Sequence, residues 1–271
     1  YVNKTVVGAP IACFYGWKTA GIMTEADFNE DGSPKVPVFS SGSTYTPGDM
    51  KFVDVNGDGV IDDNDRTFIG NPNPDFYYGF NINMEYKGFD LSMFFQGVAG
   101  NEIYDVTRYF RYSNVSYSGG WENLNYLSFS NVSEDYFDKV WRPVPDPANP
   151  SYRDHWGANL NGTVPLPSSD GTKNEMNFRN SDFYIQDGSY LRLKNIQLGY
   201  TFPKKWVNKL SVSNLRVYAS ATNLFTITSY DGLDPEVGKT SGQESNNLYL
   251  GIDQGVYPQA RSYMFGVIID F

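Results

Sequence analysis

The chain has 271 residues, 17% of them aromatic, a formal net charge of -10, one cysteine and one histidine. The acidic balance argues against a nucleic-acid partner, which needs clustered Lys and Arg, and one cysteine permits no internal disulfide. A single histidine does not supply a multi-histidine metal site, so His155 is interpreted as a loop residue and Cys13 as buried packing. No run approaches the ~18 apolar residues of a membrane helix, a test that a membrane β-barrel escapes.

The first predicted strand covers residues 11–23, where Ile11, Cys13, Tyr15 and Trp17 share one face. Strict alternation of this kind is typical of a half-buried strand. A long connection, roughly 25–75, follows.

Within that connection, residues 54–65 read DVNGDGVIDDND, which has the spacing of a Ca²⁺ loop of EF-hand type. Oxygen ligands at alternate positions wrap one hard cation, and Gly59 permits the sharp turn. The last position is Asp where an EF-hand has Glu, and a metal-free acidic turn is the alternative. A bound ion would make the loop rigid and would have no catalytic role. The expected ligands are Asp54, Asn56, Asp58, the Val60 carbonyl, Asp62 and Asp65.

Residues 76–85 and 89–100 predict a hairpin closed by a tight turn at 86–88. One face of the hairpin is apolar and the other is mostly polar. The expectation is that Phe80 and Ile82 face lipid and that Asn81 and Asn83 face a barrel lumen.

The next connection, about 102–188, is rich in aromatic residues and arginines. Such side chains stack on sugar rings or peptide side chains and anchor protein interfaces, although they also pack loops against themselves. The candidate contacts with a ligand or partner are Trp121, Trp141, Tyr109 and Arg111.

Three further strands are predicted at 190–202, 214–226 and 261–271. In the first of them, Leu191 and Leu193 are out of register with the apolar residues that follow, which predicts a bulge near Asn195. In the last, Phe265 and Val267 are expected to face lipid.

Connection lengths alternate between long and short along the chain. The long connections are 25–75, 102–188 and 227–259, and the short ones are 86–88 and 203–212. In a meander, every second connection lies at the same end of the sheet, so this order predicts short periplasmic turns and long extracellular loops of a transmembrane β-barrel. A soluble β-sandwich is the alternative. Six strands cannot close a membrane barrel, so we expect either that this chain is a fragment or that other segments complete the wall.

Several blocks resemble one known family, the SusC/RagA-type TonB-dependent transporters of Bacteroidetes outer membranes. They are PGDMKFVDVNGDGVIDDNDRTFIGNPNPDFYYGF at 47–80, GSYLRLKNIQLGYTFP at 188–203, NLRVYASATNLFTITSYDGLDPEVG at 214–238, and YPQARSYMFGVIIDF at the end. The resemblance implies an all-β, antiparallel transmembrane barrel of about 22 strands with a plug inside. Residues 1–271 would then be the C-terminal part, its last six strands with long extracellular loops and without the plug domain.

The resemblance also implies a role in an outer-membrane importer of oligosaccharides or peptides. The implied partners are a SusD-like lipoprotein lid, TonB acting through the missing N-terminal part, the remainder of the same barrel, the cargo and outer-membrane lipid. A calcium-dependent extracellular glycan-binding or adhesion module is the alternative from another class, and a siderophore-type receptor would share the barrel only. We find no catalytic motif and expect no enzymatic activity.

Overall fold

The structure, a computed structural model, describes residues 2–39, 44–112, 115–116, 128–129, 133–148, 156–166, 171–207, 212–238 and 249–271. The chain divides into two compact units. Unit 1 comprises Tyr1–Asn71, Tyr104–Ile185 and Lys239–Gln254, and unit 2 comprises Pro72–Ile103, Gln186–Gly238 and Gly255–Phe271. Most of the predicted connections 25–75 and 102–188 therefore belongs to unit 1, whereas 227–259 is divided between the two units.

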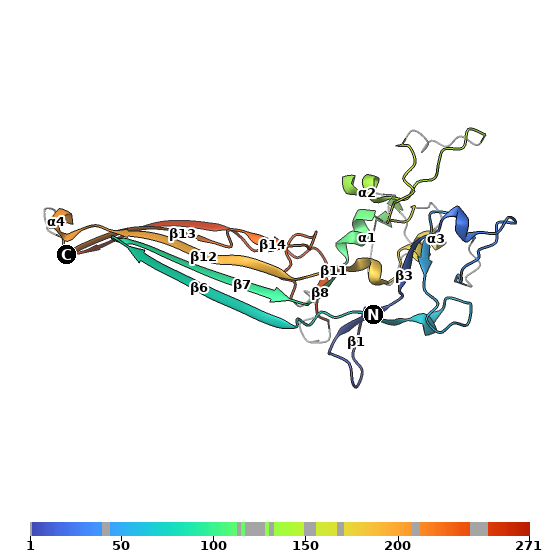
Figure 1. The fold of residues 1–271 in the computed structure, drawn as a ribbon, viewed down its shortest axis with the longest axis horizontal. Helices are drawn as coiled ribbons and strands as arrows, with labels where there is room; N and C mark the ends of the chain where they lie inside the picture. Colours follow the sequence, from blue (N-terminus) through green and yellow to red (C-terminus); the bar gives the residue numbers. More distant parts are fainter. Residues whose placement is uncertain are drawn as a thin grey trace. The chain divides into compact units, whose positions relative to one another are not determined.

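Unit 2 is built on one antiparallel sheet whose long strands lie side by side in chain order (Figure 1). The order is β6-β7-β12-β13-β16, and the short β14 adds to β12. The short helix α4 follows β12. The elements are β6 (Phe76–Tyr86), β7 (Phe89–Ala99), β12 (Tyr190–Thr201), α4 (Lys204–Val207), β13 (Asn214–Thr222), β14 (Thr226–Thr228) and β16 (Ser262–Asp270). The antiparallel meander predicted for these strands is confirmed.

A bulge in β12 keeps one face of the sheet apolar. Leu193 is opposite Phe95 of β7, Asn195 is opposite Phe94, and the register shifts between the two pairs. The shift returns the next apolar residue, Ile196, to the face that carries Leu193. The bulge predicted near Asn195 is therefore confirmed.

The apolar face is exposed to its surroundings over much of the sheet. Phe265, opposite Ala219 of β13, is 84% exposed, and Phe80 and Val267 are also exposed on this face. The alternation places Asn81 and Asn83 on the opposite face of β6. The sheet thus has the two-faced character that the sequence predicts.

An ion pair crosses the polar face over a glycine. Arg216 of β13 donates from Nε to Asp90 Oδ1 at 3.1 Å and from Nη2 to Asp90 Oδ2 at 2.5 Å. The strand between them, β12, places Gly199 directly beneath the pair. A Cβ at this position would lie 2.4 Å from Asp90 Oδ1 and 2.5 Å from Arg216 Nη2. Only glycine leaves room for this bidentate contact.

A buried charge cluster holds the segment after β14 against the polar face. Arg192 is 2% exposed and donates to Asp234 at 2.6 Å, to Glu236 at 2.7 Å and to Thr226 at 2.8 Å. Burial acts to raise the pKa of Asp234, but the Gln259 N–H and the Arg192 guanidinium outweigh it and leave the pKa lowered. The carboxylate is therefore ionised at neutral pH and fixes this connection to β12.

Unit 1 consists of short strands and short helices. Its strands form the antiparallel order β1-β2-β5 and the pairs β3-β4 and β9-β10, while β8 and β15 pair in parallel. Among the described residues, no helix is both long and apolar enough to cross a membrane. The elements are β1 (Asn3–Lys4), β2 (Cys13–Gly16), β3 (Thr19–Ile22), η1 (Glu25–Asp27), β4 (Met50–Phe52), η2 (Asp63–Asp65), β5 (Thr67–Gly70), β8 (Glu102–Asp105, which begins in unit 2), α1 (Thr107–Tyr112), β9 (Val115–Ser116), β10 (Ser128–Phe129), α2 (Glu134–Lys139), α3 (Gly171–Asn177), η4 (Asp182–Tyr184), β11 (Ile185–Asp187, which continues into unit 2) and β15 (Ile252–Asp253).

The hydrophobic core of unit 1 joins segments that are far apart in the sequence. One cluster brings Trp17 and Met50 together with Trp141 and Met176. A second packs Phe14 against Tyr104 and Tyr184, and a third surrounds Tyr112 and Phe178. Unit 1 therefore has a core of its own.

The single wall strand predicted at 11–23 is wrong. This segment forms β2 and β3, and neither belongs to the long sheet. Cys13 and Phe14 are both buried, so both faces of the strand are covered, and Ala12 has a positive φ of 59°. A short alternating run fits a buried strand as well as a wall strand, because the period is the same. Of the six predicted wall strands, five are therefore found in the sheet.

We predict that Gly199→Ala destabilises the sheet by about 1–3 kcal/mol, because the new methyl group displaces the Asp90–Arg216 pair. The measurement is the thermal unfolding midpoint of the whole detergent-solubilised protein. Gly79→Ala on the same face is the control, since its Cβ would come no closer than 3.3 Å to a neighbouring atom. Equal midpoints for the two variants would contradict the assignment.

Candidate functional site

The acidic loop at 54–65 is anchored to the core of unit 1. The Ile61 side chain is buried in the first core cluster, and its N–H donates to the Val38 carbonyl at 3.2 Å. The Trp17 indole donates from Nε1 to the Asp62 carbonyl at 2.8 Å. The loop is thus fixed by a side chain in the middle and by a backbone contact near its end.

The carboxylates of this loop accept hydrogen bonds from the loop's own backbone. Asp54 accepts from the Gly57 N–H at 2.6 Å and from the Gly59 N–H at 2.8 Å. Asp58 accepts from the Val60 N–H at 3.0 Å. Gly59 has a φ of +88°, which a side chain rarely tolerates. The chain therefore wraps around Asp54, as an Asx-stabilised turn does.

Asp65 closes the loop from within. It is buried and accepts hydrogen bonds from the N–H groups of Val55 at 2.8 Å, Asn56 at 3.3 Å and Asp62 at 2.8 Å. Burial acts to raise its pKa, but these backbone donors outweigh it and leave the pKa lowered. Ionised Asp65 therefore stabilises the fold above the ordinary carboxyl pKa, and this stabilisation is lost as the pH falls through its lower folded-state value.

The donor atoms of the loop fit a hard cation in chemistry. All six expected ligands, Asp54, Asn56, Asp58, Val60, Asp62 and Asp65, offer oxygen, which Ca²⁺ prefers. Within the described ranges, however, no group of three or more His, Cys, Asp or Glu side chains is placed to hold a metal ion. Calcium at this loop stays a prediction.

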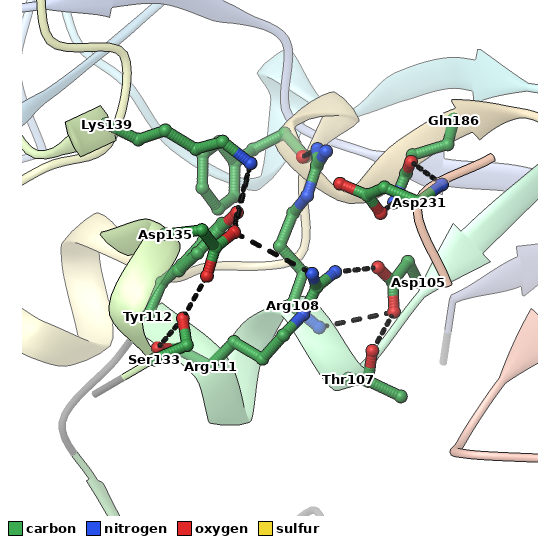
Figure 2. Close-up of polar contacts among 11 residues, drawn as sticks. Asp105, Thr107, Arg108, Arg111, Tyr112, Ser133, Asp135, Lys139, Gln186 and Asp231 are labelled. Atoms are coloured by element: carbon green, nitrogen blue, oxygen red, sulfur yellow. Dashed lines mark hydrogen bonds and ion pairs between the residues drawn. The ribbon is translucent and has the colours of Figure 1, made fainter. Parts of the chain in front are cut away.

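A charged cluster lies in the part of unit 1 contributed by 104–185. Arg111 of α1 reaches Asp105 at 2.6 Å on one side and Asp135 of α2 at 3.9 Å on the other (Figure 2). Asp105 is fully buried and also accepts from the Thr107 hydroxyl at 2.6 Å. Arg111 therefore ties α1 to both the end of β8 and the start of α2.

Asp135, Tyr112 and Lys139 form the second half of the cluster (Figure 2). Lys139 donates to the Tyr112 hydroxyl at 2.9 Å and to Asp135 at 3.0 Å, and Tyr112 donates to Asp135 at 2.8 Å. Burial acts to raise the pKa of Asp135, but the Ser133, Tyr112 and Lys139 donors leave it well below its usual range. The Tyr112 hydrogen bond raises the pKa of Lys139. Both pKa values move away from neutral pH, so Asp135 and Lys139 stay charged and are unsuited to proton transfer.

A cavity of about 320 Å³ opens beside this cluster. Arg108 and Lys139 supply cationic groups and Asp182 an anionic one. Arg108 donates from Nη1 to the Phe183 carbonyl at 2.6 Å, which fixes its direction. The full lining is Arg108, Tyr112, Lys139, Thr163, Val164, Asp182, Phe183 and Ile185. Such a mixed lining suits a polar ligand better than an apolar one.

Comparisons with known proteins show which family the chain belongs to. No protein-family model matches it. TonB-dependent receptor P3 of Formosa agariphila is 32% identical over 265 residues, which cover 97% of this chain and 22% of the relative. TonB-dependent receptor SusC of Bacteroides thetaiotaomicron is 32% identical over 227 residues, which cover 83% of this chain and 18% of the relative.

Solved structures of the RagAB peptide importer have the same fold. The closed-closed state aligns over 100% of this chain and 25% of that chain, with a TM-score of 0.58 at 19% identity. A structure of the RagAB peptide transporter aligns over 100% of this chain and 24% of that chain, with a TM-score of 0.63 at 19% identity. The chain is a SusC/RagA-like TonB-dependent transporter segment. It spans about a quarter or less of the proteins it matches.

The four contact residues predicted for the SusC/RagA-like segment have different environments. Tyr109 packs edge-on against Phe178, and Arg111 is paired with Asp105, so both hold the fold together. Trp121 lies outside the described residues. Trp141 is 2% exposed in the first core cluster, so the prediction that it contacts cargo or a lid does not fit this structure. A tryptophan that fills a core and one that stacks on a ligand look alike in sequence.

Sequence reasoning did not identify Arg108, Tyr112, Asp135 or Lys139 as a group. The spacing of Asp135 and Lys139, four residues apart, indicates a helical ion pair. Nothing in the sequence indicates that Tyr112 joins them, because that contact depends on how α1 packs against α2.

We predict that the whole protein binds Ca²⁺ at 54–65 and that Asp54→Ala/Asp58→Ala abolishes binding, because a hard cation needs these carboxylates. Isothermal titration with CaCl₂ after chelation measures the affinity. Asp31→Ala is the control, since Asp31 stabilises a similar exposed turn with Ser33 outside the loop. The absence of any binding to the unaltered protein would show that the loop is a metal-free turn.

We predict that Arg111→Met lowers the stability of unit 1 by roughly 3–5 kcal/mol, because it removes the guanidinium that pairs with the buried carboxylate of Asp105. Limited proteolysis of the whole protein measures this as faster cleavage between 104 and 185. Arg66→Met is the control, because the acidic partner of Arg66, Asp63, is exposed and lies 3.8 Å away. Cleavage at the same rate in both variants would contradict the role given to Arg111.

Proposed function

We propose that this chain forms part of the wall and the outer loops of an outer-membrane, TonB-dependent importer. The importer takes up oligosaccharides or peptides, and a SusD-like lipoprotein closes it from outside. Its action is transport, not catalysis. The observation that carries the proposal is the sheet of unit 2, which exposes one continuous apolar face and turns a polar face the other way.

The two faces of the sheet are those that a barrel wall needs. Exposed Phe80, Phe265 and Val267 would each leave large apolar surface in water, which soluble proteins avoid. In a bilayer the same residues face lipid, and the Asp90–Arg216 pair on the opposite face lines the lumen.

The outer strands of the sheet support the same assignment. Within the described part of the chain, β6 pairs only with β7, and β16 pairs only with β13. Each outer strand therefore presents a row of backbone N–H and C=O groups, and a bilayer cannot satisfy them. The remainder of the same barrel would supply the missing pairs.

The loops of unit 1 are the proposed contact region for cargo and lid. All three long connections leave from one end of the sheet, near the paired Val98 and Tyr190 and the paired Thr222 and Ser262. Long barrel loops are extracellular, so this end faces outward in the proposal. The cavity beside Arg108 and Lys139 would offer hydrogen bonds to sugar hydroxyls or peptide groups. Structural calcium at 54–65 would stiffen the same region.

A calcium-dependent extracellular glycan-binding or adhesion module is the second candidate. The folded loop, in which Asp54, Asp58 and Asp65 each accept backbone hydrogen bonds, supports it, because that loop alone would suit such a module. The exposed apolar face of the sheet favours the importer, since a soluble module has no use for it.

We predict that Phe265→Arg destabilises or prevents assembly of the whole protein, at a cost of about 2–4 kcal/mol if residue 265 lies near the bilayer midplane. Ser220→Arg is the control, because Ser220 is on the polar face of the neighbouring strand. Outer-membrane yield and heat-dependent gel migration measure assembly. In a soluble module the exposed Phe265 would meet water, and Phe265→Arg would then be harmless.

Uptake of labelled peptides and of labelled oligosaccharides separates the two cargo classes. We expect one class to enter cells that carry the whole protein, and entry to stop when TonB or the lid lipoprotein is deleted. Uptake that persists without TonB would contradict the importer.

A further inference from the structure

The short-turn end of the sheet in unit 2 gathers lysines and aromatic rings. The turn after β6 carries Lys87, whose ammonium lies 5.0 Å from the centre of the Tyr86 ring. The Thr201 N–H donates to the Gly88 carbonyl at 2.8 Å, so this turn lies beside the end of β12. The chain continues from there into α4, which adds Lys204, Lys205 and Trp206.

Helix α4 presents its charged and aromatic side chains outward. Val207 is buried and anchors the helix, whereas Trp206 is 52% exposed and both lysines are exposed. Within the described ranges, neither lysine ammonium has a hydrogen bond or an ion pair. Cations without an acidic partner stand out in a chain of net charge -10. The neighbouring acids Glu85 and Asp270 alternate onto the polar face of the sheet.

An apolar groove of about 470 Å³ lies in the same sheet. It forms because Ala219 is small, while its neighbours Leu198 and Phe265 on the paired strands are large. Its lining also includes Phe89 and Tyr200, whose rings are 4.5 Å apart, and Tyr200 leads through Phe202 to Trp206. The groove is thus joined by aromatic rings to the lysines of α4.

We propose that this groove and α4 bind one glycerophospholipid with an anionic head group, an inference that rests on the proposed membrane function. An acyl chain fills the groove over Ala219, and the phosphate lies at Lys204 and Lys205. Trp206 lies at the level of the head groups, where an amphipathic ring is favoured. Charge complementarity selects this occupant, because an apolar groove with lysines at its end matches an acyl chain with an anionic head. In the proposed orientation the lipid belongs to the periplasmic leaflet.

The test titrates phosphatidylglycerol into the whole, delipidated protein in detergent and counts bound lipid by native mass spectrometry. Lys204→Gln/Lys205→Gln should weaken phosphatidylglycerol binding on the order of tenfold, because the variant removes the two positive charges that attract the phosphate. Lys18→Gln/Lys35→Gln, with the same change of charge in unit 1, should leave the affinity unchanged. Phosphatidylcholine should bind several-fold more weakly than phosphatidylglycerol to the unaltered protein.

A second variant tests the groove independently of the charges. Ala219→Phe fills the groove on an outward face and should lower the affinity for both lipids, while heat-dependent gel migration confirms that the barrel has folded. Equal phosphatidylglycerol binding by the unaltered protein and the lysine variant would overturn the proposal, as would tighter binding of lipid A at this site. If the whole protein needs no detergent, the importer itself is contradicted, whereas a detergent-requiring barrel with unchanged lipid binding contradicts the lipid site alone.

Discussion

Alternation of apolar and polar side chains along paired strands is the constraint on which this structure depends. Each strand of unit 2 must keep its apolar residues on one face, because a shift of one residue would reverse both faces. Strand β12 meets this requirement only through its bulge between Leu193 and Asn195. The bulge leaves Arg192 on the polar face, where it is buried with Asp234 and holds the following connection. One local irregularity thus serves both the continuous apolar face and the attachment of a loop.

Unit 1 is stabilised differently from the sheet, by enclosed hydrophobic cores and paired charges. Its segments come from three stretches of the chain, and they enclose cores built around Trp17, Phe14 and Tyr112. Its charges are paired with one another, as Arg111 with Asp105 and Lys139 with Asp135 show. Loops that carry their own core and charge pairs can present a defined surface. That property suits the role proposed for unit 1 as a contact region.

The part of the candidate site that could be predicted from the sequence is the loop at 54–65, because its motif is defined by the spacing of residues along the chain. The ligand pattern of 54–65 repeats at fixed intervals, and the loop does wrap around Asp54. The roles of Trp141 and Arg111 depend instead on distant neighbours. Trp141 meets a core that includes Trp17 and Met50, and Arg111 meets Asp105 and Asp135. Aromatic and cationic residues serve packing and binding with the same chemistry, so composition alone does not separate the two uses.

The local sequence pattern determined the five long strands, the bulge in β12 and the separation of short from long connections. The reason is that side chains alternate between the two faces of any strand, independently of the rest of the chain. The segment 11–23 shows the limit of that rule. Its alternation is genuine, yet Phe14 packs on Tyr104 and Tyr184, and the segment became β2 and β3 of unit 1. Whether a strand joins the wall or a compact unit depends on which surfaces cover its two faces. The surface that covers Phe14 comes from residues ninety or more positions away, and only the folded chain brings them together.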